Sequence, residues 1–193
     1  MIAHLQGKLV EKNPTYTIIE CNGIGYFLNI SLHTFSKIPD SEAVKLYTYL
    51  SVKEDSHTLF GFCDKVEREI FKLLISVSGV GPSIARTMLS SMTPEQIQHA
   101  IASEDVAVIQ SVKGIGAKTA QRVIIDLKDK IVKTYELSGD SMQSGNTIKE
   151  EALSALEVLG FSRKQVEKLV QKIVQETPDT AVEDIIKRAL KNL

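Results

Sequence analysis

The chain has 193 residues, of which 43% are hydrophobic and 24% charged, a composition typical of a folded globular protein with two or three compact domains. No window offers the ~18 uncharged apolar residues of a membrane-spanning helix, and the first residues lack a secretory signal, so we expect a cytoplasmic protein with no membrane partner. The 23 basic and 24 acidic residues leave a net charge of −1, which excludes bulk positive charge as the basis of any nucleic-acid binding.

Residues 1–63 have the pattern of short strands separated by turns. Asn13-Pro14 and Asn22-Gly23 mark two of the turns, and we interpret Gly23-Ile24-Gly25 as a β-turn between two strands. Five strands with one irregular insert near residues 32–38 predict a small closed β-barrel of the oligonucleotide-binding (OB) type. The expected strands are Ile2–Val10, Tyr16–Cys21, Tyr26–Ile30, Ala43–Val52 and Thr58–Cys63.

Residues 64–137 change to a helical spacing of apolar positions, which predicts an all-α domain. The segment Thr93-Pro94-Glu95-Gln96 is typical of a helix start. Threonine caps the helix, proline suits its first position, and the glutamine three residues after the threonine completes a capping box. Of the three folded regions, this is the only one in which basic residues outnumber acidic ones.

Residues 138–147 are polar and rich in glycine and serine, and we interpret them as a flexible linker. Residues 148–193 predict a small three-helix domain of the UBA-like kind, so the fold class is α+β with several domains. Its first helix, Ile148–Leu159, is expected to end at Gly160 in a left-handed cap, while Ser162 and Thr180 begin capping boxes of the next two. So small a domain is marginal alone, which favours a docking role.

A self-alignment with a shift of about 35 residues gives the one informative repeat. Gly79-Val80-Gly81 aligns with Gly114-Ile115-Gly116, and each copy joins two helical segments, as in a helix-hairpin-helix motif. Glycine permits a positive φ and the close approach of a phosphate, while the apolar residue between the glycines anchors the turn in the core. Unpaired amides at the start of the following helix form an anion site without net charge. We therefore predict a tandem helix-hairpin-helix domain that binds the DNA backbone without reading sequence.

Side chains near the two hairpins add candidate phosphate contacts, and the later copy is the richer of the two in lysine and arginine. The predicted DNA-binding residues are Gly79, Val80, Gly81, Ser83, Arg86, Lys113, Gly114, Ile115, Gly116, Lys118, Thr119 and Arg122.

Catalytic and metal-dependent functions find little support in the sequence. The segment around Lys118 lacks the glycine that a nucleotide-binding P-loop places directly before its lysine. Asp126 follows the second hairpin, as in a hairpin-class glycosylase, but there is no tryptophan and no aromatic pocket for a flipped base. We expect Cys21 and Cys63 to be reduced core residues. The histidines share no spacing with cysteines or carboxylates, so we predict no catalytic residues, no cofactor and no metal.

Two alternatives to a non-catalytic DNA-binding subunit stay open. One is a repair nuclease or glycosylase that uses the hairpins for non-specific grip, and strand cleavage or base release would identify it. The other is a barrel that binds single strands.

The order of barrel, hairpin pair, linker and three-helix domain resembles the RuvA family of bacterial Holliday-junction-binding subunits over the whole chain. The matching pieces are Met1-Ile2 with Leu5-Gln6-Gly7, Gly23-Ile24-Gly25-Tyr26, Lys53-Glu54-Asp55, Leu59-Phe60-Gly61-Phe62, Gly79-Val80-Gly81-Pro82, the segment from Gly114 to Ala120, Ala152-Leu153-Ser154-Ala155-Leu156, and Leu159-Gly160-Phe161.

The resemblance implies a subunit that binds four-way junction DNA as a homotetramer, with one hairpin pair on each duplex arm. Whether one tetramer or two in an octamer bind the junction stays open. Glu54 and Asp55 match the family's acidic pin, whereas Ser83 replaces the lysine that often follows the first hairpin. The C-terminal domain would dock RuvB, a hexameric ATPase motor, and a junction resolvase is a further implied partner. The candidate motor-binding residues are Leu156, Leu159, Phe161, Leu169 and Ile186.

Overall fold

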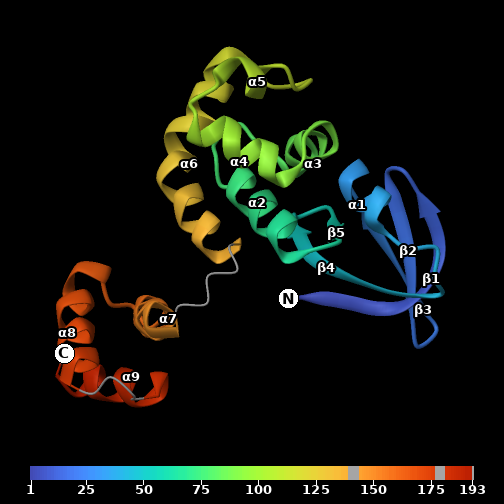
Figure 1. Ribbon diagram of the computed structural model, residues 1–193. Coiled ribbons are helices and arrows are strands. Elements are labelled where there is room, and N and C mark those ends of the chain that lie inside the picture. Colours follow the sequence, from blue (N-terminus) through green and yellow to red (C-terminus); the bar gives the residue numbers. More distant parts are fainter. Residues whose placement is uncertain (139–143, 177–180, 193) are drawn as a thin grey trace. The chain divides into compact units, whose positions relative to one another are not determined.

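The computed structural model describes residues 1–138, 144–176 and 181–192 (Figure 1). The chain forms two compact units, Met1–Gly139 and Asp140–Leu193, and each has a core of its own. None of the described helices is both long enough and apolar enough to cross a membrane.

The first part of the larger unit is a closed β-barrel, which confirms the predicted five-stranded fold. Around the barrel the strands follow the order β1-β2-β3-β5-β4, and the closing pair, β3 with β5, is parallel whereas the other pairs are antiparallel. Ile19, Leu28 and Leu46 are buried in the interior. The strands are β1 (His4–Asn13), β2 (Tyr16–Cys21), β3 (Ile24–Asn29), β4 (Ala43–Val52) and β5 (His57–Phe62).

Several local features of the barrel differ from the sequence prediction. Strand β1 spans His4–Asn13, so it begins two residues later and ends three residues later than the predicted Ile2–Val10. Strand β3 begins at Ile24, two residues earlier than expected, because the turn needs only Asn22 and Gly23, whose φ angles are +52° and +83°. Both angles are positive, as a tight hairpin turn requires. The expected irregular insert contains helix α1 (Leu32–Lys37), and the side chain of Ser31 accepts a hydrogen bond from the Thr34 N–H at its start.

Five helices follow the barrel in the larger unit (Figure 1). Their core includes Phe60 and Phe62 of β5, whereas the barrel interior has a separate cluster. The ring of Phe71 on α2 lies 5.1 Å from the ring of Phe60 and 4.9 Å from that of Phe62, both on β5. The predicted capping box at Thr93 is confirmed, since both of its hydrogen bonds with Gln96 are present. The helices are α2 (Lys65–Ile75), α3 (Pro82–Ser91), α4 (Pro94–Ala102), α5 (Val106–Gln110) and α6 (Ala117–Ser138).

The smaller unit contains α7 (Ser144–Val158), α8 (Arg163–Glu176) and α9 (Val182–Lys191), which pack on one another. Gly160 has φ +100° and the Phe161 N–H donates to the Leu156 carbonyl at 3.1 Å, so the predicted left-handed cap is confirmed.

The predicted boundaries of this unit need two corrections. Helix α7 begins at Ser144, four residues before the expected start, so the proposed linker 138–147 overlaps it, and the part from 139 to 143 lies outside the described residues. The residue that caps α9 is Ala181, without a side-chain hydrogen bond. Thr180, the predicted cap, lies outside the described residues.

Replacing Phe71 with alanine should destabilise the larger unit by about 3–5 kcal/mol, because the ring is fully buried and packs between the barrel and the helices. Denaturant unfolding followed by circular dichroism measures the loss. Phe27→Ala is the matched control, since its ring is 50% exposed on the barrel surface and should cost much less. Equal losses for the two variants would contradict the shared core.

Candidate nucleic-acid interface

The two Gly-x-Gly segments form turns of the same geometry. In the first, the Val80 N–H donates to the Val77 carbonyl at 3.0 Å, and in the second, the Ile115 N–H donates to the Val112 carbonyl at 3.1 Å. The middle residues are buried, with 4% and 6% of their surface exposed. The first glycine of each segment has φ +94°, a conformation that residues with a side chain rarely adopt. The backbone conformation of the turn itself therefore requires glycine at the first position of each segment.

The second glycine of each segment has a different role. Gly81 has φ −85°, an ordinary angle, and precedes α3, while Gly116 precedes α6. A Cβ atom on either glycine would meet nothing within 4 Å. The fold itself thus has space for a Cβ atom at both positions, and the absent side chain leaves room for an outside group to approach the backbone amides of the next helix.

The backbone amides in the first turn of α3 are suited to binding an anion. Helix α3 has no side-chain hydrogen bond at its N-terminus and starts with Pro82, so the N–H groups of Ser83 and Ile84 point out of the first turn without a capping side chain. The positive end of the helix dipole adds to them. The arrangement is that of a phosphate-binding helix start.

The two hairpins contact each other reciprocally. A Cβ at Gly79 would lie 3.6 Å from the Thr119 hydroxyl oxygen, and one at Gly114 would lie 4.0 Å from Ile84 Cγ1. Thr119 and Ile84 occupy equivalent positions of the repeat, just as the two glycines do. The two hairpins are therefore related by a local pseudo-twofold symmetry.

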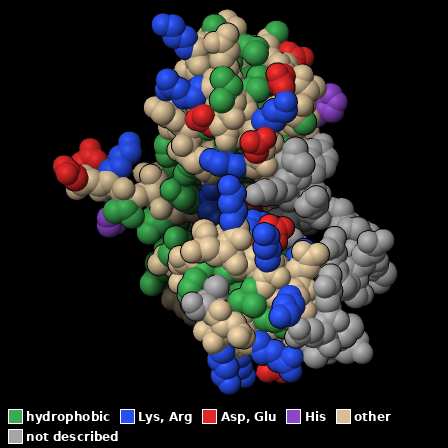
Figure 2. Space-filling model, turned by 90° about the vertical axis from the view of Figure 1, so that its left-hand side faces the viewer, with side chains coloured by type: hydrophobic (Ala, Val, Ile, Leu, Met, Phe, Trp, Pro, Cys, Tyr) green, Lys and Arg blue, Asp and Glu red, His purple; other side chains and the backbone are tan. Residues whose placement is uncertain are grey.

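Most of the predicted side chains near the hairpins are accessible. Ser83, Lys113 and Lys118 are exposed, and Thr119 is half-buried. The Arg122 guanidinium is exposed and donates to the Ser78 carbonyl at 3.3 Å, so it bridges from α6 to the first hairpin. Figure 2 shows basic and acidic side chains intermingled on the visible face, as expected for a net charge of −1.

Arg86 differs from the other predicted contacts, because the barrel already holds it. Its guanidinium Nη1 donates to the Thr15 carbonyl at 3.1 Å and to Asn29 Oδ1 at 2.9 Å. Arg86 therefore fixes α3 against the barrel. The sequence gives no signal for this contact, because its acceptors lie 57 and 71 residues away along the chain.

The acidic pair Glu54 and Asp55 forms the tip of the β4–β5 turn. The Lys53 N–H donates to the Ser56 carbonyl at 2.8 Å and closes the turn below them. Both acidic residues are exposed, so the turn presents two negative charges to solvent.

The candidate motor-binding residues fall into two groups. Leu156 is fully buried in the core of the smaller unit, so it supports the surface and does not form it. Leu159 is 56% exposed, and its neighbour Val158, which sequence reasoning missed, is 88% exposed. Two consecutive apolar residues just before Gly160 could have signalled an exposed patch. The other candidates, Phe161, Leu169 and Ile186, are half-buried around this core.

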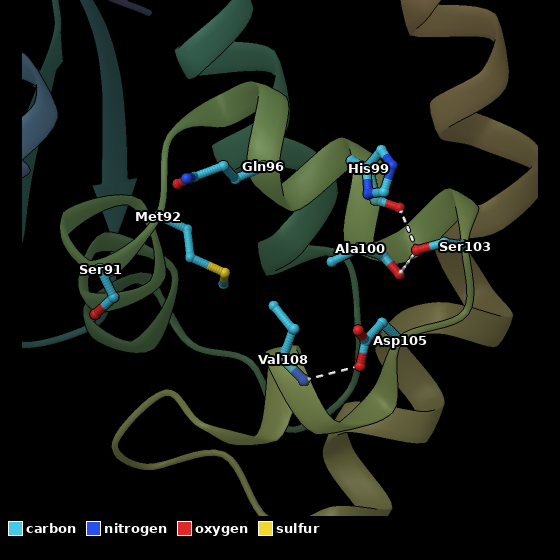
Figure 3. Close-up of a pocket in the computed structure, with 8 residues that line it drawn as sticks. All are labelled: Ser91, Met92, Gln96, His99, Ala100, Ser103, Asp105 and Val108. Carbon is cyan, nitrogen blue, oxygen red and sulfur yellow. Dashed lines mark hydrogen bonds between the residues drawn. The ribbon is translucent and has the colours of Figure 1, made fainter.

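A surface pocket of about 340 Å³ opens between the end of α3, helix α4 and the start of α5 (Figure 3). Its polar groups serve the helix ends: Asp105 Oδ1 accepts from the Val108 N–H at 3.1 Å, and the Ser103 hydroxyl donates to the His99 carbonyl at 2.8 Å. Met92 and Ala100 also line this pocket. Among its lining residues, no nucleophilic side chain contacts a side chain that could act as its base.

Alanine in place of the second glycine of each hairpin should change DNA affinity without changing stability. Gly81→Ala and Gly116→Ala should leave the free energy of unfolding nearly unchanged while lowering affinity for every DNA form, because the new methyl groups cover the amides. The matched controls are Gly79→Ala and Gly114→Ala, which should cost about 1–3 kcal/mol each through backbone strain. Gel shifts and denaturant melts measure the two effects, and unchanged DNA affinity in the first pair would contradict the anion site.

Comparisons with known proteins cover the whole chain. The family described as RuvA N terminal domain matches residues 1–61, SAM-like Helix-hairpin-helix tandem matches residues 71–129, and RuvA, C-terminal domain matches residues 147–193. Relatives from Christiangramia forsetii and Flavobacterium psychrophilum are 68% and 65% identical over 100% of both chains, and one from Bacteroides thetaiotaomicron is 47% identical over the same share. All three are named Holliday junction branch migration complex subunit RuvA. With these regions matched in order and such full-length relatives, the chain belongs to the RuvA family.

Proposed function

We propose that this protein is a non-catalytic subunit that binds four-way (Holliday) junctions as a tetramer, holds them open and recruits a RuvB-type ATPase motor for branch migration. The observation that carries the proposal is the reciprocal pair of Gly-x-Gly hairpins, whose exposed glycines leave two helix starts open to phosphates. The names of its full-length relatives support the same function. A cytoplasmic location and contact with a junction resolvase belong to the proposal as well.

The hairpins provide grip that does not depend on sequence. Backbone amides and helix dipoles contact phosphate oxygens, which are the same at every base pair. Lys113, Lys118 and Arg122 add charge at the second hairpin, and Ser83 offers a hydroxyl at the first. Each phosphate that a cation neutralises contributes about −0.9 to the slope of log affinity against log salt concentration.

Junction preference needs a feature beyond the hairpins. In a tetramer with fourfold symmetry, four copies of Glu54 and Asp55 would meet at the crossover. Their carboxylates would repel phosphates there and disfavour a continuous duplex across the centre. The turn that bears them belongs to the same compact unit as the hairpins, so the spacing between repulsive and attractive groups is built into the fold.

The smaller unit supplies the motor contact in this proposal. Its core is complete without Val158 and Leu159, which remain exposed at the end of α7. Exposed apolar side chains next to one another are typical of a protein-binding surface.

A gel-shift comparison tests the proposal as a whole. The purified protein is mixed with labelled four-way junction, linear duplex or single strand at two salt concentrations, with magnesium present. We expect the junction to bind most tightly, with affinity falling as salt rises and all strands intact. Strand cleavage or base release would replace the proposal with an enzyme, and preference for single strands would replace it with a single-strand-binding barrel.

Neutralising the acidic tip should relax the preference for junctions. The double variant Glu54→Gln with Asp55→Asn should retain junction affinity and bind linear duplex more tightly, because the repulsion of phosphates is lost. The matched control is Glu42→Gln, which removes an exposed charge elsewhere on the barrel and should change neither affinity. Competition gel shifts measure the ratio, and a loss of junction affinity would contradict the role of the pin.

Leu159→Ser should uncouple the motor while sparing DNA. Removing an exposed apolar contact at a protein interface is expected to weaken motor binding by about tenfold or more. Val10→Ser is the control, since Val10 is 55% exposed on the barrel and should leave motor binding unchanged. Pull-down with the RuvB-type motor and a branch-migration assay measure the effect, and equal behaviour of the two variants would contradict the assignment.

A further inference from the structure

Four side chains with metal-binding atoms meet where the barrel joins the helices. They are His33 on α1, Cys63 and Asp64 in the link after β5, and Glu67 in the first turn of α2. Each offers one ligand atom, and these atoms all lie within 4.8 Å of one another. None of the four belongs to the predicted DNA, pin or motor contacts.

The local structure holds three of these side chains in place. Asp64 caps α2 by accepting from the Glu67 N–H through Oδ1 at 2.7 Å, which leaves its Oδ2 directed at the cluster. The Cys63 Sγ lies 3.2 Å from Asp64 Oδ2 and 3.4 Å from Glu67 Oε2. Helix α1 is fixed to the same point, because Thr34 Oγ1 accepts from the Cys63 N–H at 3.1 Å and donates to Glu67 Oε2 at 2.5 Å.

His33 provides an independent observation. Its Nε2 is buried and has no hydrogen-bond partner, and one nitrogen of the same ring contributes to the cluster. A buried polar atom without a partner is costly and uncommon in folded proteins. A neutral imidazole nitrogen that carries a lone pair is also a preferred ligand of zinc. Arg68 Nε and Gln98 Nε2 are the other buried side-chain atoms without a partner in the described residues, but only His33 belongs to a cluster of metal-binding groups. A cation bound through His33 Nε2 would supply the partner that this atom lacks.

We propose that His33, Cys63, Asp64 and Glu67 form a binding site for a single Zn²⁺ ion. A tetrahedral zinc with bonds of about 2.0–2.3 Å separates its ligand atoms by about 3.3–3.8 Å. The two distances from Cys63 Sγ to the carboxylate oxygens already fall close to this range. The other pairs of ligand atoms lie within 4.8 Å of each other, so zinc binding requires them to approach by about 1 Å. Thiolate and imidazole favour zinc over magnesium or calcium, which prefer oxygen alone.

The binding step balances in charge and protons. An unbound cysteine thiol carries its proton near neutral pH, since its ordinary pKa is about 8.5. Zinc replaces this proton, which leaves to solvent, and a sulfur–zinc bond forms. The Cys63 thiolate and the carboxylates of Asp64 and Glu67 then carry three negative charges. The zinc ion carries two positive charges and the Lys37 ammonium, which lies 3.2 Å from Asp64 Oδ2, carries one, so the formal charges sum to zero.

The position of the site implies a structural effect. Its ligands come from α1, from the end of β5 and from α2, so a bound ion would link the barrel directly to the first helix of the hairpin domain. At a free zinc concentration a hundred times the Kd, the unfolding equilibrium constant should fall by about 100-fold.

The test uses the full chain and zinc itself. The metal-free protein is dialysed against buffered Zn²⁺ and its bound metal is counted, and Co²⁺ is added separately as a spectroscopic probe. We expect one ion per chain, a higher melting temperature, and for cobalt the sulfur charge-transfer band and intense visible bands of a tetrahedral thiolate site. His33→Ala and Cys63→Ser should each lower zinc affinity by at least tenfold.

Two controls make the result decisive. Cys21→Ser removes the other free cysteine, and His99→Ala removes an exposed histidine on α4, so both variants should bind zinc like the original protein. Circular dichroism verifies that each variant is folded, and His33→Ala decides alone where Cys63→Ser does not fold. Absence of stoichiometric zinc in the original protein, or unchanged affinity in His33→Ala, overturns the proposal.

Discussion

The carboxylate of Glu67 is fully buried at the joint between barrel and helices, and the geometry of the larger unit depends on how it is held. A buried charge is costly unless hydrogen bonds compensate it. Here the hydroxyls of Ser31 and Thr34, both from the barrel side, donate to its two oxygens, and the Cys63 thiol adds a third contact. The rings of Phe60, Phe62 and Phe71 pack in the adjoining core. Polar and apolar contacts thus join the barrel and the helices into one unit.

That joint has a functional consequence for the DNA contacts. In the proposed function, attraction at the hairpins and repulsion at the acidic tip select a junction only when the distance between them is fixed. The barrel bears the tip, and the helices bear the hairpins, so a loose connection would separate the two effects. Arg86 reinforces the connection by holding α3 to Thr15 and Asn29. We therefore regard it as a positioning residue of the interface.

The smaller unit is organised separately from the larger one. It has its own core, and its apolar residues at the end of α7 stay exposed. A separate unit can bind a motor while the larger unit retains its DNA, because the two tasks share no described side chain. Within the larger unit, by contrast, strand β5 contributes Phe60 and Phe62 to the core of the hairpin domain, and the polar groups around Glu67 join the barrel to the helices.

The sequence by itself determined the features that local interactions control. Short runs of residues between turn signals indicated the five strands, and glycines at a fixed spacing indicated the two hairpins. The capping box at Thr93 and the left-handed cap at Gly160 follow from hydrogen bonds within a few residues. The helix start at Ser144 was missed, because polar residues without apolar periodicity carry little helical signal.

Only the tertiary structure decided which side chains are free and which distant groups meet. It placed Leu156 in the core, engaged Arg86 with the barrel, and brought His33 next to Cys63, 30 residues further along the chain. These outcomes depend on how strands and helices pack, and periodicity along a chain specifies a face of an element without specifying its partner.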